Sequence, residues 1–202
     1  SSNPEWLTVY NGNLYFAANN GSNGVELWSY DSATNTLGLA ADINSGGNSS
    51  NPEWLTVYNG NLYFAADNGS SGVELFRYDG SNATLAADIN SGSGSSNPAW
   101  LTVYNGRLYF AADNGSSGFE LWSYNSTTNT ASLAADINSV GGSNPEYLTV
   151  YNGSIFLTAF DTTIGTELRI FYEQQPTSLT IANGSQSTTV NTAFSNPVVV
   201  TV

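Results

Sequence analysis

The chain has 202 residues, is 40% hydrophobic and carries a formal net charge of −13, with three arginines as its only basic side chains. It contains no histidine, cysteine or lysine, which excludes Ser-His-Asp catalysis, thiol and lysine nucleophiles, and metal sites built from imidazole or thiolate. The acidic charge disfavours binding to nucleic-acid phosphates, and no apolar run approaches the roughly 18 residues of a membrane span. These absences predict a protein that is not an enzyme.

A short segment recurs along the chain and sets its organisation. It reads NPEWLTVYNG from Asn3 and from Asn51, NPAWLTVYNG from Asn97 and NPEYLTVYNG from Asn144. A spacing of about 47 residues indicates a supersecondary unit that is repeated in space. We therefore divide the chain into repeats 3–50, 51–96, 97–143 and 144–182, followed by a C-terminal tail at 183–202.

Each repeat is predicted to be a four-stranded antiparallel meander, and the second repeat shows the pattern. Asn59 and Gly60 form the strongest short hairpin signal, because both central positions of a type I′ turn need a positive φ. The predicted strands around this turn are 54–58, 61–67, 73–78 and 83–89, and a Ser/Gly linker follows at 90–98. Repetition of such a unit predicts an all-β, β-propeller-like array of about four blades, with a β-solenoid as the alternative.

The fourth repeat departs from this pattern after Glu167 and Leu168. Arg169 stands where the other repeats have Trp or Phe, and Pro176 interrupts the sequence before a last predicted strand at 177–182. No exchange of strands between the two ends is predicted to lock a ring. The blades therefore either close by packing alone or form part of a longer array.

The tail ends on a strongly β-prone run that has no predicted partner strand. Such a strand belongs either to a divided domain or to an interaction with another chain. The predicted interaction strand consists of Pro197, Val198, Val199, Val200, Thr201 and Val202.

The acidic residues form a second pattern. Most are predicted on one face of the array, because the turn between the second and third strands shares that face with the inter-blade linker. Carboxylates beside Gly-rich loops are ligands suited to Ca²⁺. The candidate calcium ligands are Asp67 with Glu74, Asp113 with Glu120, and Asp161 with Glu167. The structural alternative is that each Asp caps its own turn and each Glu binds nearby backbone amides.

Aromatic residues recur before the first strand of each repeat, at Trp6, Trp54, Trp100 and Tyr147. If these rings were exposed, they would be able to stack on sugars in a lectin-like propeller. Their recurrence at one position of every repeat favours packing between blades instead. Symmetric repetition also argues against a pair of glycosidase carboxylates, which needs one acid in a distinct environment.

The repeats resemble bacterial surface-protein repeats that are named for a Glu-Leu-Trp strand. The motif stands at Gly24–Trp28, Gly72–Phe76, Gly118–Trp122 and, in part, Gly165–Leu168. Its companion, Asn-Gly-x-Leu-Tyr-Phe, stands at Asn11–Phe16, Asn59–Phe64 and Asn105–Phe110. The stretch from Pro176 is similar to the opening of bacterial Ig-like domains of invasin-type adhesins. Both resemblances imply a modular protein that is extracellular or at the cell surface.

The sequence thus favours a non-enzymatic structural or adhesive module of a prokaryotic surface protein. Its expected partners are further copies of itself or neighbouring domains, and donation of the strand Pro197–Val202 would build a filament. The alternative is a carbohydrate-binding propeller with glycans as partners. No cofactor is expected apart from the calcium considered above.

Overall fold

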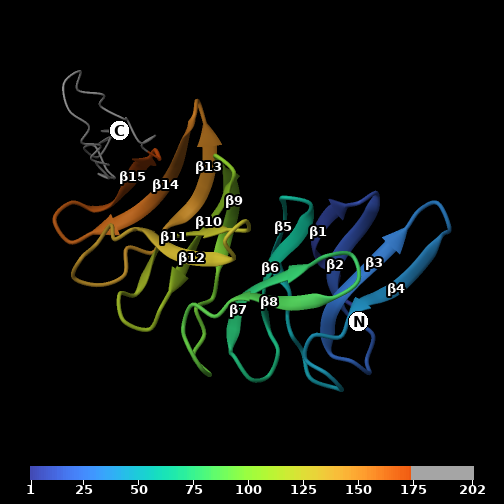
Figure 1. Cartoon of the computed structure of the whole chain (residues 1–202). Helices are drawn as coiled ribbons and strands as arrows, with labels where there is room; N and C mark the ends of the chain where they lie inside the picture. Colours follow the sequence, from blue (N-terminus) through green and yellow to red (C-terminus); the bar gives the residue numbers. More distant parts are fainter. Residues whose placement is uncertain (174–202) are drawn as a thin grey trace, which may run out of the picture.

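The computed structural model describes residues 1–173, which form fifteen β-strands and contain no helix (Figure 1). Two predicted strands, 177–182 and Pro197–Val202, lie outside these residues. Within the described part of the chain, no helix is long and apolar enough to cross a membrane.

The strands form four antiparallel sheets, which we call blades 1 to 4. Blade 1 consists of β1 (Glu5–Tyr10), β2 (Asn13–Asn19), β3 (Val25–Asp31) and β4 (Thr36–Ala41). Blade 2 consists of β5 (Glu53–Tyr58), β6 (Asn61–Asp67), β7 (Val73–Tyr78) and β8 (Ala83–Ala87). Blade 3 consists of β9 (Ala99–Tyr104), β10 (Arg107–Asp113), β11 (Phe119–Asn125) and β12 (Thr130–Ala135). Blade 4 has three strands among the described residues: β13 (Glu146–Tyr151), β14 (Ser154–Asp161) and β15 (Gly165–Phe171).

The order of the strands in each sheet follows the chain, which confirms the predicted meanders and the β-propeller-like fold. The first strands β1, β5, β9 and β13 contact one another in sequence, so the blades are stacked through their first strands. Blades 1 and 4 stand at opposite ends of the row (Figure 1). The described chain is therefore an open arc of blades and not a closed ring.

The hairpins confirm the predicted turns, but the first strand of each blade contains an aromatic residue with an unexpected positive φ. Asn59 and Gly60 have φ of 44° and 75°, as a type I′ turn requires. Trp54 also has a positive φ, 59°, at a bulge where the register with β6 shifts between Glu53 and Thr56. A positive φ is unfavourable for a bulky side chain, so contacts between blades must hold this residue in place.

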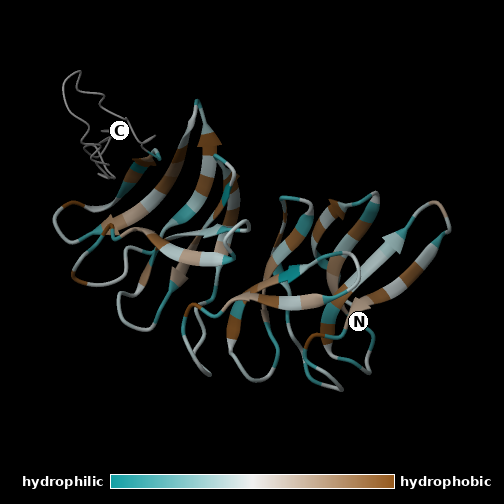
Figure 2. Cartoon of the chain, in the orientation of Figure 1, coloured by the Kyte–Doolittle hydropathy of each residue, from teal (hydrophilic) through white to brown (hydrophobic). Residues whose placement is uncertain are grey.

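The hydrophobic core lies between blades, and each of its clusters is shared by two neighbours. Tyr10, Tyr15 and Leu27 of blade 1 form one cluster with Leu55, Leu62, Phe64, Ala66, Phe76 and Tyr78 of blade 2. Both faces of the second strand in an inner blade are buried, since one faces the blade before it and the other the blade after it. This explains the nearly continuous apolar run of β6, whereas the loops at the blade ends are mostly hydrophilic (Figure 2).

Candidate functional site

A fully buried carboxylate joins each inner blade to the linker that follows it. Glu74 lies in β7, opposite Ala66 of β6, and none of its surface is exposed. Its Oε2 accepts the amide of Ile89 at 2.8 Å, and its Oε1 accepts the amide of Asn90 at 3.2 Å. The start of the linker is therefore fixed to the third strand of its own blade.

The same carboxylate holds the end of the linker through one serine. Ser96 donates its amide to Oε1 of Glu74 at 2.9 Å and its hydroxyl to Oε2 at 2.5 Å. The carbonyl of Ser96 accepts the amide of Asp113, at the end of β10 in the next blade, at 3.0 Å. Ser96 thus connects blade 2 to blade 3, and we call the Glu–Ser unit the inter-blade clamp.

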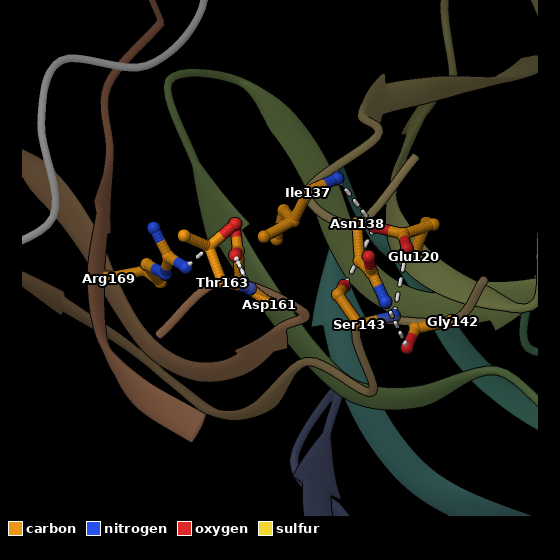
Figure 3. A network of polar contacts seen from close by, with 8 residues as sticks. All are labelled: Glu120, Ile137, Asn138, Gly142, Ser143, Asp161, Thr163 and Arg169. Atoms are coloured by element: carbon orange, nitrogen blue, oxygen red, sulfur yellow. Dashed lines mark hydrogen bonds and ion pairs between the residues drawn. The ribbon is translucent and has the colours of Figure 1, made fainter. Parts of the chain in front are cut away.

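The clamp recurs in blades 1 and 3 with the same geometry. Glu26 accepts the hydroxyl of Ser50 at 2.6 Å, and Glu120 accepts that of Ser143 at 2.7 Å. Figure 3 shows Glu120 with its donors on Ile137 and Ser143. Sequence reasoning missed these serines, although a serine precedes the Asn-Pro pair at the start of each of the four repeats, at Ser2, Ser50, Ser96 and Ser143.

Burial and hydrogen bonding act in opposite directions on the clamp carboxylates. Burial raises the pKa of Glu74 above its ordinary value, while the bonds from Ser96 and the linker amides lower it. Burial raises the pKa of Glu26 and of Glu120 in the same way. A buried carboxylate needs such donors, because an unpaired charge in an apolar environment is strongly destabilising.

Glycine at the start of the third strand gives the linker room to reach the clamp. A Cβ on Gly72, whose φ is 68°, would lie 2.3 Å from the carbonyl oxygen of Gly94 in the linker. Gly24 and Gly118 are approached in the same way by the backbone of their own linkers. The recurring glycine before Val-Glu-Leu or Phe-Glu-Leu is thus required by close backbone contact and by its φ.

Aromatic rings and hydroxyl groups add further contacts between blades. Trp6, Trp54, Trp100 and Tyr147 form one column, with neighbouring ring centroids 4.5 to 4.6 Å apart. At the far end of the first strand, the hydroxyl of Tyr10 donates to the carbonyl of Gly60 in the next blade at 3.0 Å. Tyr58 and Tyr104 donate in the same way to the following blades. The observed packing agrees with the structural interpretation of the repeated aromatic residues.

The structure does not join the predicted calcium ligands into shared sites. Asp67 pairs with Val73, and Ala66 pairs with Glu74, so the side chains of Asp67 and Glu74 point to opposite faces of the sheet. Asp67 instead accepts the amide of Gly69 at 2.7 Å, as the structural alternative predicts.

The other two candidate pairs are also separate. The Asp113 carboxylate accepts the amide of Gly115, and Glu120 belongs to a clamp. Asp161 accepts the amide of Thr163 at 2.7 Å, which lowers its pKa, and it forms an ion pair with Arg169 at 3.3 Å (Figure 3). Glu167 is partly exposed. Within residues 1–173, no three acidic side chains are placed to hold a metal ion together.

Arg169 is the clearest break in the symmetry of the blades. It pairs with Leu157, as Trp122 pairs with Phe110 in blade 3, so a buried guanidinium replaces an aromatic ring. Its ion pair with Asp161 partly compensates for burial of the charge. The departure noticed in the sequence thus lies inside the fold, because the Arg169 side chain is buried.

Comparisons with known proteins support the fold. No family model matches the chain, and no curated protein matches it. Among solved structures, it is similar to a puromycin hydrolase mutant complexed with PGG, with 16% identity and a TM-score of 0.50 over 90% of this chain and 27% of that one. It is also similar to Bacteroides ovatus xyloglucan PUL GH43B, with 16% identity and a TM-score of 0.46 over 95% of this chain and 41% of that one. The chain thus spans less than half the length of either structure. At 16% identity, the likeness to the puromycin hydrolase, which has the TM-score of 0.50, concerns the fold alone.

Proposed function

We propose that this chain is a non-enzymatic structural module of an extracellular, cell-surface protein. Its stacked blades would hold neighbouring domains apart or display them. The observation that carries this proposal is the use of the acidic side chains. The buried carboxylates Glu26, Glu74 and Glu120 all bind linkers, and they do so identically in successive blades. A catalytic carboxylate would need an environment that differs from its counterparts.

The resemblance to Glu-Leu-Trp repeats and to the opening of an Ig-like domain supports the surface location. An antibody raised against the purified chain provides the test on intact cells of the source organism. We expect labelling without permeabilisation, and loss of that labelling after brief protease treatment. Labelling that requires permeabilisation would contradict the surface role. Turnover of p-nitrophenyl glycosides or aminoacyl amides by the purified chain would contradict the non-enzymatic role.

Carbohydrate binding is the second candidate, and the partly exposed tryptophans of the aromatic column are the observation in its favour. Each inner ring contacts a tilted neighbouring ring on both sides, so Trp6 and Tyr147, at the ends of the column, each have one side without such a neighbour. Binding to a glycan array that is lost in Tyr147→Ala would support this candidate. Absence of binding across a broad array would count against it.

A further inference from the structure

The two ends of the blade row present surfaces that are buried everywhere else in the chain. Leu7 of blade 1 is 58% exposed. Its equivalent in blade 2, Leu55, packs against blade 1 and is only 8% exposed. At the other end, Tyr151 of blade 4 is 68% exposed, whereas Tyr10 at the same position of blade 1 is 2% exposed. Among residues 1–173, each end therefore lacks the neighbouring blade that an inner blade has.

These end surfaces are the two halves of the internal interface. The open face of blade 1 consists of Leu7, Leu14, Phe16, Ala18, Trp28 and Tyr30, which line an apolar hollow. Their equivalents in blade 2 all belong to the core shared with blade 1. The open face of blade 4 consists of Tyr151, Phe156 and Leu168, the equivalents of Tyr10, Tyr15 and Leu27 in that same core. Blade 4 thus presents the same type of surface that, on blade 1, packs against the blade 2 equivalent of the open face.

The inter-blade clamp is also divided between the two ends. Ser2 precedes an Asn-Pro pair, and its carbonyl accepts the amide of Asn19 at 3.0 Å, as the carbonyl of Ser96 accepts that of Asp113. No glutamate among residues 1–173 binds the Ser2 hydroxyl, because no blade precedes it in the described chain. Glu167 stands at the opposite end, at the position of Glu74, and no serine in the described part binds it.

Two further contacts stop at the ends in the same complementary way. The aromatic column begins at Trp6 and stops at Tyr147, which is exposed. The hydroxyl of Tyr151 is the equivalent of the Tyr10 hydroxyl, which donates to the carbonyl of Gly60 in the next blade. If blade 1 of a second copy followed blade 4, the matching acceptor would be its Gly12 carbonyl, which is the equivalent of the Gly60 carbonyl. Apolar surface, clamp, column and hydroxyl donor are thus all half complete at each end.

We propose that the open face of blade 1 binds the open face of blade 4 of a second copy of this chain. In this head-to-tail contact Glu167 accepts the amide and hydroxyl of Ser2 from the second copy, and Tyr147 packs against its Trp6. The proposal rests on the proposed structural role and names the partner for it. Because the contact joins two different surfaces, it builds a ring where the rotation closes and a filament where it does not. It needs no part of the strand Pro197–Val202.

The matched variants Leu7→Asp and Leu39→Asp test this contact. Leu39 is 38% exposed, and its equivalent Leu85 in an inner blade is also 38% exposed, so a neighbouring blade does not cover this position. Both leucines are exposed in the separate chain, and neither change removes a core contact. Tyr151→Asp, at the opposite end, is a second independent variant.

Sedimentation velocity of the full chain provides the readout, in about 0.3 M NaCl so that repulsion between acidic copies is screened. We expect the wild type and Leu39→Asp to associate with rising concentration, and Leu7→Asp and Tyr151→Asp to need at least about tenfold higher concentrations because a buried apolar side chain is lost from the contact. A wild type that stays monomeric would overturn the proposal, as would equal association of Leu7→Asp and Leu39→Asp. Loss of association on deleting residues 198–202, with Leu7→Asp unaffected, would assign assembly to strand donation instead. These results concern the purified chain, so the contact can fail while surface labelling of cells still supports the structural role.

Discussion

Replacing Glu74 with glutamine tests whether the inter-blade clamp stabilises the fold. Each carboxylate oxygen of Glu74 accepts two hydrogen bonds: Oε1 from the amides of Asn90 and Ser96, and Oε2 from the amide of Ile89 and the hydroxyl of Ser96. Glutamine keeps one acceptor oxygen and brings an NH₂ group to the other position. The fit is best where this NH₂ takes the place of Oε2 and faces the Ser96 hydroxyl, because the hydroxyl can turn and become the acceptor.

One donor still has no acceptor in that arrangement, namely the amide of Ile89. An unsatisfied buried donor costs about 1–3 kcal/mol, and the bonds that remain change from charged to neutral, which weakens each by about 1 kcal/mol. Relief from burying a charge offsets part of this loss. We therefore expect Glu74→Gln to lower the free energy of unfolding by about 2–3 kcal/mol.

Urea unfolding at neutral pH, followed by tryptophan fluorescence, measures this change. Glu167→Gln is the matched control at chain concentrations too low for association, because Glu167 occupies the same position of blade 4 but is partly exposed and has no clamp serine in the described chain. We expect the control to change the free energy of unfolding by less than about 0.5 kcal/mol. Equal effects of the two variants, or a more stable Glu74→Gln, would show that the clamp does not stabilise the fold.

Three further predictions follow from the same contacts. Gly72→Ala should lower the free energy of unfolding by about 3 kcal/mol or more, because its Cβ would overlap the Gly94 carbonyl. The control Gly60→Ala, at a φ of 75° but with open space around it, should lower it by only about 1 kcal/mol. Similar losses of stability for the two variants in thermal melts would contradict the close contact at Gly72. Burial raises the pKa of Glu74 above 4.5, so the folded chain holds this proton more tightly than the unfolded chain; stability should therefore fall as pH rises from 4.5 through the raised pKa. Urea titrations should show a shallower fall in Glu74→Gln, and identical slopes would argue against the effect. Because linker donors occupy the Glu74 carboxylate, exchanging chelator for millimolar Ca²⁺ should shift the melting temperature by less than about 1 °C, whereas a rise of about 5 °C would support calcium binding.

The repeat made most of the fold predictable. The period of the Asn-Pro segments gave the blades, and Asn59-Gly60 gave the hairpin because few other pairs tolerate two positive φ values. The last strand of blade 2 was predicted at 83–89 but is observed at Ala83–Ala87. The strand is shorter because the amide of Ile89 turns away from the sheet to bind Glu74.

The clamp was only half predictable. Binding of Glu74 to backbone amides was considered, but its complete burial and its serine partner were not, because glutamate is seldom buried and Ser96 lies 22 residues away in the sequence. The positive φ of Trp54 was also missed, since no local signal marks a tryptophan for that conformation. Whether the blades close into a ring depends on the rotation between them, and single-residue patterns carry no information about that angle.

Successive blades join through one repeated interface, and the two halves of that interface are open at the ends of the described row of blades. A mixture of Leu7→Asp and Tyr151→Asp tests it most directly, because each variant keeps the end surface that the other has lost. Sedimentation velocity of the equimolar mixture should show a one-to-one dimer that grows no further, while each variant alone stays monomeric at the same concentration. A mixture that sediments as monomer, under conditions in which the wild type associates, would contradict the claim.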